Sequence, residues 1–469
     1  MGIPGFLYQF IGVNLKNYSL DRRKTFTTVM LFLLNILPCV GLLQSQNPIS
    51  PPGVYIADPT ARVWNDGKLY MYGSLDESCD DYCSARHHLL VTEDMKNWEL
   101  VDNIFTSKGN GDGVPYNDKV LYAPDAAYKD GIWFLYYCQP DREFAEGVAT
   151  SSNPAGPFQN GASINLKGYN QIDPATFIDD DGTAYYLWGQ FTLKMGELKP
   201  NMKELDLNSV RDSIITEGEH HFHEGAFMTK INGIYYIVFA DLSRGDIPTC
   251  IGYATANSPF GPYKYGGVII DNNHCNPSNW NNHGSIAEYK GQWYVFYHRS
   301  THGCNTMRKA CVEPIKILED GSIPEVEMTS QGAAEPLDAT VLIDAARACI
   351  LNGNIRIEQF ADYNEDLTKI HSGDKAGYKY LNFGDGVDSV TFRISAGPKR
   401  GKIVVSLDKP WHTRLGILEI QPGNGEQWQD LTFPIQRASG IHALWLHFYG
   451  DDEQMFSIDW FTFSKIKNP

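Results

Sequence analysis

A short pattern of apolar and polar residues recurs along the first two thirds of the chain. In each copy an apolar strand carries one polar residue, a turn containing glycine follows, and the next strand is rich in tyrosine and tryptophan. Residues 171–188 show the pattern most fully, with Asp173 in the first strand and the turn at Asp179–Gly182. Alternation that is broken by a turn of this composition is typical of a β-hairpin.

Five such hairpins follow one another at similar intervals. Their turn glycines are spaced by 64, 51, 51 and 58 residues and are Gly67, Gly131, Gly182, Gly233 and Gly291. Repeats of this length that are built from strands favour radial sheets over a single sandwich. We therefore expect an all-β protein in which residues 47–330 form a five-bladed β-propeller.

One polar residue occupies nearly the same place in every hairpin, six to nine positions before the turn glycine. In chain order these residues are Asp58, Asp125, Asp173, Glu224 and His283. The first strand of each blade lines the axis of a propeller, so equivalent positions converge on one point. Solvated turn acids are the alternative interpretation, but Asp58, Asp173 and Glu224 lie within apolar runs, where an unpaired carboxylate is costly.

The pattern changes at both ends of this region. Residues 1–46 contain a basic group and then a mostly apolar run, Val29–Leu43, which is too short for a bilayer span and typical of an export signal. This predicts a secreted or periplasmic protein, and Pro38 argues against a lipid anchor on Cys39. Residues 331–345 are a predicted linker, and residues 346–469 contain short alternating strands that predict a β-sandwich of the jelly-roll type.

Composition narrows the class of ligand. The net charge of −17 argues against a nucleic-acid partner, and the aromatic content of 13% favours sugar contact or aromatic β cores. A neutral sugar fits this balance. The close pairs Cys79 with Cys83, and Cys304 with Cys311, would permit local disulfides in an oxidising compartment.

Two or three acids in one cleft, beside aromatic side chains, suit acid–base cleavage of a glycosidic bond. One carboxyl group must be protonated to donate to the leaving oxygen, and another must be ionised to activate water. His221 and His223 flank Glu224, but strand alternation predicts that they face away from it. No catalytic metal is therefore expected. Trp188, in the hairpin with Asp173, is a candidate for sugar contact.

The ordered set of Asp58-Pro, Ala-Pro-Asp125, Ile-Asp173-Pro, Glu224-Gly and His283-Gly-Ser resembles glycoside hydrolase family 43 over about residues 50–325. The resemblance implies a five-bladed propeller that cleaves with inversion of configuration. It further implies that Asp58 is the general base, that Glu224 is the general acid, and that Asp173 orients this acid and tunes its pKa.

The same resemblance implies further site residues. Asp125 and Arg308 match positions near the substrate, and His283 matches a histidine that ligates calcium, directly or through water, in some members of the family.

The C-terminal region resembles carbohydrate-binding module family 6, through Ile357-Glu358 at its start and Ile458-Asp459-Trp-Phe at its end. Glu358 and Asp459 match positions that help to hold a structural calcium ion. Tyr378 and Trp411 are candidates for stacking on sugar. Ser457 replaces the family's ligand-binding asparagine, so a purely structural role for this module stays open.

The sequence thus predicts a monomeric, exo-acting, inverting glycosidase with an oligo- or polysaccharide substrate. We expect terminal α-L-arabinofuranosyl or β-D-xylosyl groups of plant-type polysaccharides to be removed, with no cofactor needed for the chemistry and with calcium in a structural role. A β-galactosidase, galactofuranosidase or galactanase of the same family, and a retaining furanosidase of another five-bladed family, are the enzymatic alternatives. A non-catalytic sugar-binding propeller is the alternative of another class.

Overall fold

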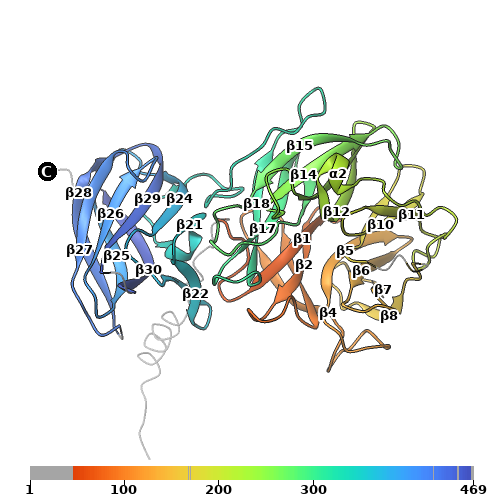
Figure 1. Cartoon of the computed structure of the whole chain (residues 1–469), viewed down its shortest axis with the longest axis horizontal. Coiled ribbons are helices and arrows are strands. Elements are labelled where there is room, and N and C mark those ends of the chain that lie inside the picture. Colours follow the sequence, from red (N-terminus) through yellow and green to blue (C-terminus); the bar gives the residue numbers. More distant parts are fainter. Residues whose placement is uncertain (1–45, 167, 169–170, 426, 452–453, 466–469) are drawn as a thin grey trace, which may run out of the picture. The chain divides into compact units, whose positions relative to one another are not determined.

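The computed structural model describes residues 46–465, except for 167, 169–170, 426 and 452–453 (Figure 1). The predicted export signal lies almost wholly outside this part of the chain. The described residues lie mostly in strands, turns and loops, with one short α-helix, α2 (Glu217–His220), after Thr216. None of their helices is long and apolar enough to cross a membrane.

The described residues from 55 to 315 form five small antiparallel sheets, numbered one to five in chain order. Sheets one and two each have four strands: β1 (Tyr55–Val63), β2 (Leu69–Asp76), β3 (Arg86–Thr92) and β4 (Glu99–Thr106), then β5 (Tyr122–Lys129), β6 (Ile132–Cys138), β7 (Glu146–Ser151) and β8 (Gln159–Ser163). Sheet three contains β9 (Ala175–Ile178), β10 (Ala184–Trp188) and β11 (Lys194–Glu197).

Sheets four and five continue the series in the same order along the chain. They contain β12 (Phe222–Ile231), β13 (Ile234–Asp241), β14 (Cys250–Ala256) and β15 (Lys264–Asp271), then β16 (Ser285–Tyr289), β17 (Gln292–Ser300) and β18 (Arg308–Ile315). Each predicted hairpin is present as the first two strands of a sheet. Tight turns such as Asn232-Gly233 have positive φ at both residues, which explains the glycine at the second position.

Apolar clusters join each sheet to the next. Tyr72 and Leu135 belong to a cluster between sheets one and two, and similar clusters connect two with three, three with four, and four with five. A further cluster, with Ile56 of sheet one and Phe296 of sheet five, joins the first sheet to the last. The main core of the region is thus divided among the junctions between sheets.

The C-terminal region contains two sheets of six strands. The first contains β19 (Leu337–Asp338), β24 (Lys375–Asn382), β29 (Ile441–Gly450), β26 (Gly401–Leu407), β27 (Arg414–Ile420) and β21 (Ile350–Asn352). The second contains β22 (Arg356–Ala361), β23 (Asn364–Thr368), β30 (Phe456–Lys465), β25 (Val387–Ala396), β28 (Trp428–Ala438) and β20 (Ile343–Asp344). The 3-10 helix η1 (Ala345–Arg347) follows β20. Side chains from both sheets, such as Phe392 and Leu446, share one apolar core, as in a β-sandwich.

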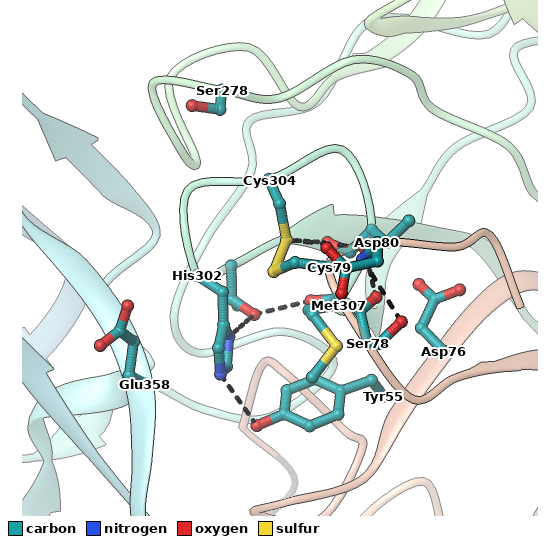
Figure 2. Close-up of a disulfide and its surroundings, with 12 residues drawn as sticks. Tyr55, Asp76, Ser78, Cys79, Asp80, Ser278, His302, Cys304, Met307 and Glu358 are labelled. Carbon is teal, nitrogen blue, oxygen red and sulfur yellow. Dashed lines mark hydrogen bonds between the residues drawn. A yellow bond between two sulfur atoms is a disulfide. The ribbon is translucent and has the colours of Figure 1, made fainter.

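A disulfide connects Cys79, after β2, with Cys304, in the loop between β17 and β18 (Figure 2). The local pairs that the spacing would permit do not form, because Cys83 and Cys311 are free and buried. Contact between sheets one and five brings residues 225 positions apart in the chain to a Cα separation of 5.7 Å. Spacing along the sequence could not reveal this pair, since contact between sheets one and five creates it.

Reduction of this disulfide is expected to lower thermal stability. A crosslink across so long a loop constrains the unfolded chain and stabilises the fold by about 2–4 kcal/mol. Dithiothreitol, or the double change Cys79→Ser/Cys304→Ser, should lower the melting temperature by roughly 5–10 °C. Scanning calorimetry measures this shift. Dithiothreitol should leave the melting temperature of the double variant unchanged, and equal values for the wild type with and without reductant would contradict the prediction.

Candidate active site

Three of the predicted acids line one cavity of about 250 Å³. Asp58 comes from β1, Asp173 from the segment before β9, and Glu224 from β12. His283 and Arg308 line the same cavity. Four further residues that the sequence did not single out complete much of its wall, namely Tyr82, Tyr122, Gln190 and Trp280.

Irregular backbone places the acids. Asp58 and Asp173 have φ values of 52° and 63°, in the left-handed region that is uncommon for residues other than glycine. The pairing of β1 with β2 shifts register between Ala57 and Thr60, and that of β12 with β13 shifts on both sides of Glu224. Such irregularities re-aim side chains near functional sites. They also break strict alternation, so His223 lies 3.8 Å from Glu224, contrary to the sequence prediction.

Asp58 is held in its ionised form. Its Oδ1 lies 2.8 Å from Nη1 of Arg308, and its Oδ2 accepts a hydrogen bond of 2.7 Å from Ser74. Burial alone would raise the pKa of Asp58, but the charge of Arg308, together with His283, His298 and the hydrogen bond from Ser74, outweighs burial and holds this pKa well below its usual value. An ionised carboxylate in a cavity can accept a proton from water.

Two histidines beside Asp58 are neutral. Burial, followed by the charge of Arg308, lowers the pKa of His298 to about 3, and burial lowers the pKa of His283. Nδ1 of His298 accepts the Asp58 N–H at 3.2 Å, which leaves its Nε2 to donate to Asn281. Arg308 is therefore the positive charge that balances Asp58.

Arg308 is itself fixed by a second acid. Its Nε and Nη2 both lie 2.9 Å from the carboxylate of Asp76, and only 2% of Arg308 is exposed. Arg308 lines the cavity. Its contact with substrate remains a prediction. Asp76 was missed, although its place at the end of the fully buried strand β2 marks it as unusual.

Glu224 has neutral donors around it. Its Oε2 accepts a hydrogen bond of 2.7 Å from Gln190, and its Oε1 accepts one of 3.3 Å from Asn281. Among the described residues, no arginine or lysine forms an ion pair with it, and His223 is its nearest basic neighbour at 3.8 Å. Glu224 therefore sits in a different electrostatic environment from Asp58, within the same cavity.

Asp173 and His283 line the cavity beside the other two acids. Burial, then the charges of Glu224 and Asp58, raises the pKa of Asp173 well above its usual value. Nδ1 of His283 lies 3.6 Å from Asp58 and 3.9 Å from Asp173. The His283 ring also packs on Gly225, where a Cβ atom would come within 2.9 Å of the ring, so the Glu-Gly pair is needed here.

Three predicted contact residues are buried. Asp125 is 1% exposed, and its carboxylate is bound by Arg62 at 2.7 Å and by Thr176. Trp188 and Tyr378 are 0% exposed. Trp188 packs in the cluster between sheets two and three, and the hydroxyl of Tyr378 donates to Ala345. Their burial gives no support to substrate contact, which stays a prediction for all three residues.

The predicted calcium ligands are accounted for by protein partners. Glu358 pairs with Lys369, and Asp459 lies 3.2 Å from Arg393. Within the described part of the chain, no group of three or more His, Cys, Asp or Glu is arranged to hold a metal ion. Structural calcium at Glu358 and Asp459 therefore stays a prediction, and no step of the chemistry is assigned to a metal. Calcium at His283 remains a prediction.

Comparison with known families gives two matches. The family described as "Glycosyl hydrolases family 43" matches residues 45–323, and "Carbohydrate binding module (family 6)" matches residues 349–465. A relative from Thermoclostridium stercorarium named xylosidase/arabinosidase is 30% identical over 476 residues, which cover 87% of this chain and 96% of the relative.

Solved structures agree with this assignment. A family 43 β-xylosidase/α-arabinofuranosidase from a compost metagenome, in complex with xylotriose, is 30% identical with a TM-score of 0.51, over 59% of this chain and 97% of the other. An arabinoxylan arabinofuranohydrolase from Bacillus subtilis covers 90% of this chain and 98% of its own length, with a TM-score of 0.53. At 24% identity, this second likeness shows the fold alone.

Loss of the Arg308 charge is expected to destabilise the fold. Arg308→Met would leave Asp58 and Asp76 buried without their cation, which should lower the free energy of unfolding by about 3–5 kcal/mol. Urea denaturation followed by fluorescence measures this loss. Arg244→Met is the matched control, because Arg244 forms only exposed pairs with Asp271 and Glu325 and should change stability by less than about 1 kcal/mol. Equal effects of the two substitutions would contradict the prediction.

Proposed function

The chain belongs to glycosyl hydrolases family 43, and we propose that it is an exo-acting, inverting glycosidase that removes terminal α-L-arabinofuranosyl or β-D-xylosyl groups from plant-type polysaccharides. The observation that carries the proposal is the cavity in which Asp58 is paired with a cation while Glu224 is held by amides. A cavity of about 250 Å³ suits a terminal sugar unit better than the middle of a polymer. The names of the relatives support the choice of sugars.

The proposed mechanism uses one acid and one base. Asp58, ionised beside Arg308, takes a proton from a water molecule that attacks the anomeric carbon. Glu224 gives its proton to the glycosidic oxygen of the leaving group, and the configuration is inverted. Gln190 and Asn281 donate to Glu224 and so orient its carboxyl group. Asp173, whose pKa is raised by burial, limits further negative charge in the cavity.

We propose that the five sheets are the blades of a five-bladed propeller over residues 47–330, followed by a linker and a sandwich module. The sequence predicted the linker at 331–345 and the module at 346–469, but β19 and β20 already pair with β24 and β30 of the sandwich, so the module begins by Leu337. The cluster and the disulfide between sheets one and five support closure of the ring. The disulfide also supports the proposal that residues 1–46 direct export to an oxidising compartment.

A panel of nitrophenyl glycosides tests the function directly. Arabinofuranosides, xylosides, galactosides and galactofuranosides distinguish the proposed activity from its alternatives within the family. Proton NMR of the first-formed sugar should show the inverted anomer. A retained anomer would point to a retaining mechanism, and no turnover on any glycoside or on arabinoxylan would leave a sugar-binding protein as the better description.

Removal of either proposed catalytic carboxyl group is expected to abolish most activity. Asp58→Asn and Glu224→Gln should each lower kcat on natural substrate by about 10²–10⁴-fold, because proton transfer then lacks its base or its acid. An activated aryl leaving group should partly rescue the Glu224 variant, since it needs little protonation. The exposed acids Asp130 and Glu219 provide control substitutions of the same type. A rate near that of wild type for either site variant would overturn the assignment.

Asp173 is expected to set the basic limb of the pH–rate profile. Two neighbouring buried carboxyl groups resist a second negative charge, so the pair keeps its proton to higher pH. Asp173→Asn removes this repulsion and should move the basic limb of kcat/KM to lower pH, with each unit of displacement equal to about 1.4 kcal/mol. Full pH profiles of the variant and the wild type measure it, with circular dichroism as the check of folding. An unchanged basic limb would show that Asp173 only positions other groups.

A further inference from the structure

The outer face of one sandwich sheet carries an ordered set of polar and aromatic side chains. In β29, Leu444, Leu446 and Phe448 point into the core, so the alternate residues Trp445, His447 and Tyr449 face outward. Across the sheet, His447 lies opposite Lys375 of β24, and Tyr449 lies opposite Lys402 of β26. Aromatic rings and cations are thus neighbours on this face.

Trp411 stands at the edge of this face, in the loop between β26 and β27. It is 80% exposed, which is rare for so large an apolar side chain. It borders two concavities, one of about 650 Å³ with His447 and Tyr449, and one of about 380 Å³ with Trp445. The nitrogen of Trp445 donates to the carbonyl of Asp408, which fixes this second ring.

The charge of the two concavities is opposite to that of the chain. Their walls contain Lys375, Lys402, Lys409 and Arg414 but no aspartate or glutamate, whereas the whole chain has a net charge of −17. Lys402 is paired with Glu419 at 3.0 Å. Among the described residues, no ion pair holds Lys375, Lys409 or Arg414.

We propose that this face, the Trp411 surface, binds polysaccharide that bears uronic acid groups. It consists of Lys375, Lys409, Trp411, Arg414, Trp445 and Tyr449. The aromatic rings offer flat apolar faces for sugar rings, and the free cations offer partners for carboxylates. A neutral glycan would leave three cations without partners, whereas a uronate supplies the complementary charge. This inference rests on the proposed function, because the bound polysaccharide would carry the terminal sugar groups that the enzyme removes.

Binding of the whole protein to xylan that carries glucuronic acid side groups tests the proposal. The comparison polymer is the same xylan after chemical reduction of its carboxyl groups to alcohols. Affinity electrophoresis at low salt should show at least about fivefold tighter binding to the acidic polymer, and this difference should disappear near 0.5 M salt, where charges are screened. Equal affinity for the two polymers at low salt would overturn the uronate assignment.

Two variants separate the roles of charge and ring. Lys375→Gln/Lys409→Gln/Arg414→Gln should reduce binding of the acidic xylan to the level of the reduced polymer. Trp411→Ala should weaken binding of both polymers by at least about tenfold. The matched control, Lys96→Gln/Lys108→Gln/Lys264→Gln, removes the same charge from exposed sites elsewhere. An equal loss of binding in this control would mean that only net charge matters, and would overturn the proposal.

Two further readouts distinguish sugar binding at this surface from catalysis and from self-association. Both surface variants should hydrolyse a small nitrophenyl glycoside at the wild-type rate, because they lie outside the catalytic cavity. A wild type that binds acidic xylan but cleaves no glycoside would contradict the proposed function and leave the Trp411 surface intact. Concentration-dependent dimers that Trp411→Ala dissociates, and that acidic xylan does not, would identify the surface as a contact between copies of this chain and overturn the polysaccharide assignment.

Discussion

The arrangement of the catalytic cavity depends on one buried cation. Arg308 is 2% exposed and holds the carboxylates of Asp58 and Asp76 through three nitrogens. Burial of these charges costs desolvation free energy. Loss of one partner is strongly destabilising, because the remaining charge stays buried without an opposite charge. The backbone at Asp58 has a positive φ, beside the register shift between β1 and β2. This conformation persists because Arg308 holds the side chain of Asp58 and His298 accepts its N–H.

The same strand links this cavity to the C-terminal module. Arg308 and Lys309 are adjacent in β18, so their side chains leave opposite faces of the strand. Lys309 lies 2.7 Å from Glu365 of β23, and both are buried, as Arg308 and Asp58 are on the other face. Glu365 also accepts the amide of Gly53, two residues before β1. The module is therefore attached at strands that carry the proposed base and its cation, which makes it part of the support of the cavity.

Much of the cavity could be predicted from the sequence, because hairpin repeats place Asp58, Asp173, Glu224 and His283 at equivalent positions, and the structure brings all four to one cavity. Asp125 occupies the same kind of position but binds Arg62, a long-range pairing without a local signal. The partners of Asp76 and Cys79 are equally non-local, since contact between sheets one and five brings them together. Core and exposed aromatics such as Trp188 and Trp411 also differ only in tertiary burial. The sequence pattern therefore predicts the strands, their turns and their repetition. It does not predict the ion-pair, disulfide and packing partners that lie far apart in the sequence.

Acid–base cleavage requires two carboxyl groups in opposite protonation states within one low-dielectric cavity. Like charges at short range oppose ionisation of both, so some asymmetry in their surroundings must decide which one keeps its proton. In this chain the two carboxyl groups differ in their hydrogen-bond donors. Asp58 is paired with the charged guanidinium of Arg308, whereas Glu224 accepts hydrogen bonds from the neutral amides of Gln190 and Asn281. Burial of Asp173 with both groups raises its pKa and limits the total negative charge. In the proposed mechanism, the direction of proton transfer thus follows from the position of Arg308 beside Asp58.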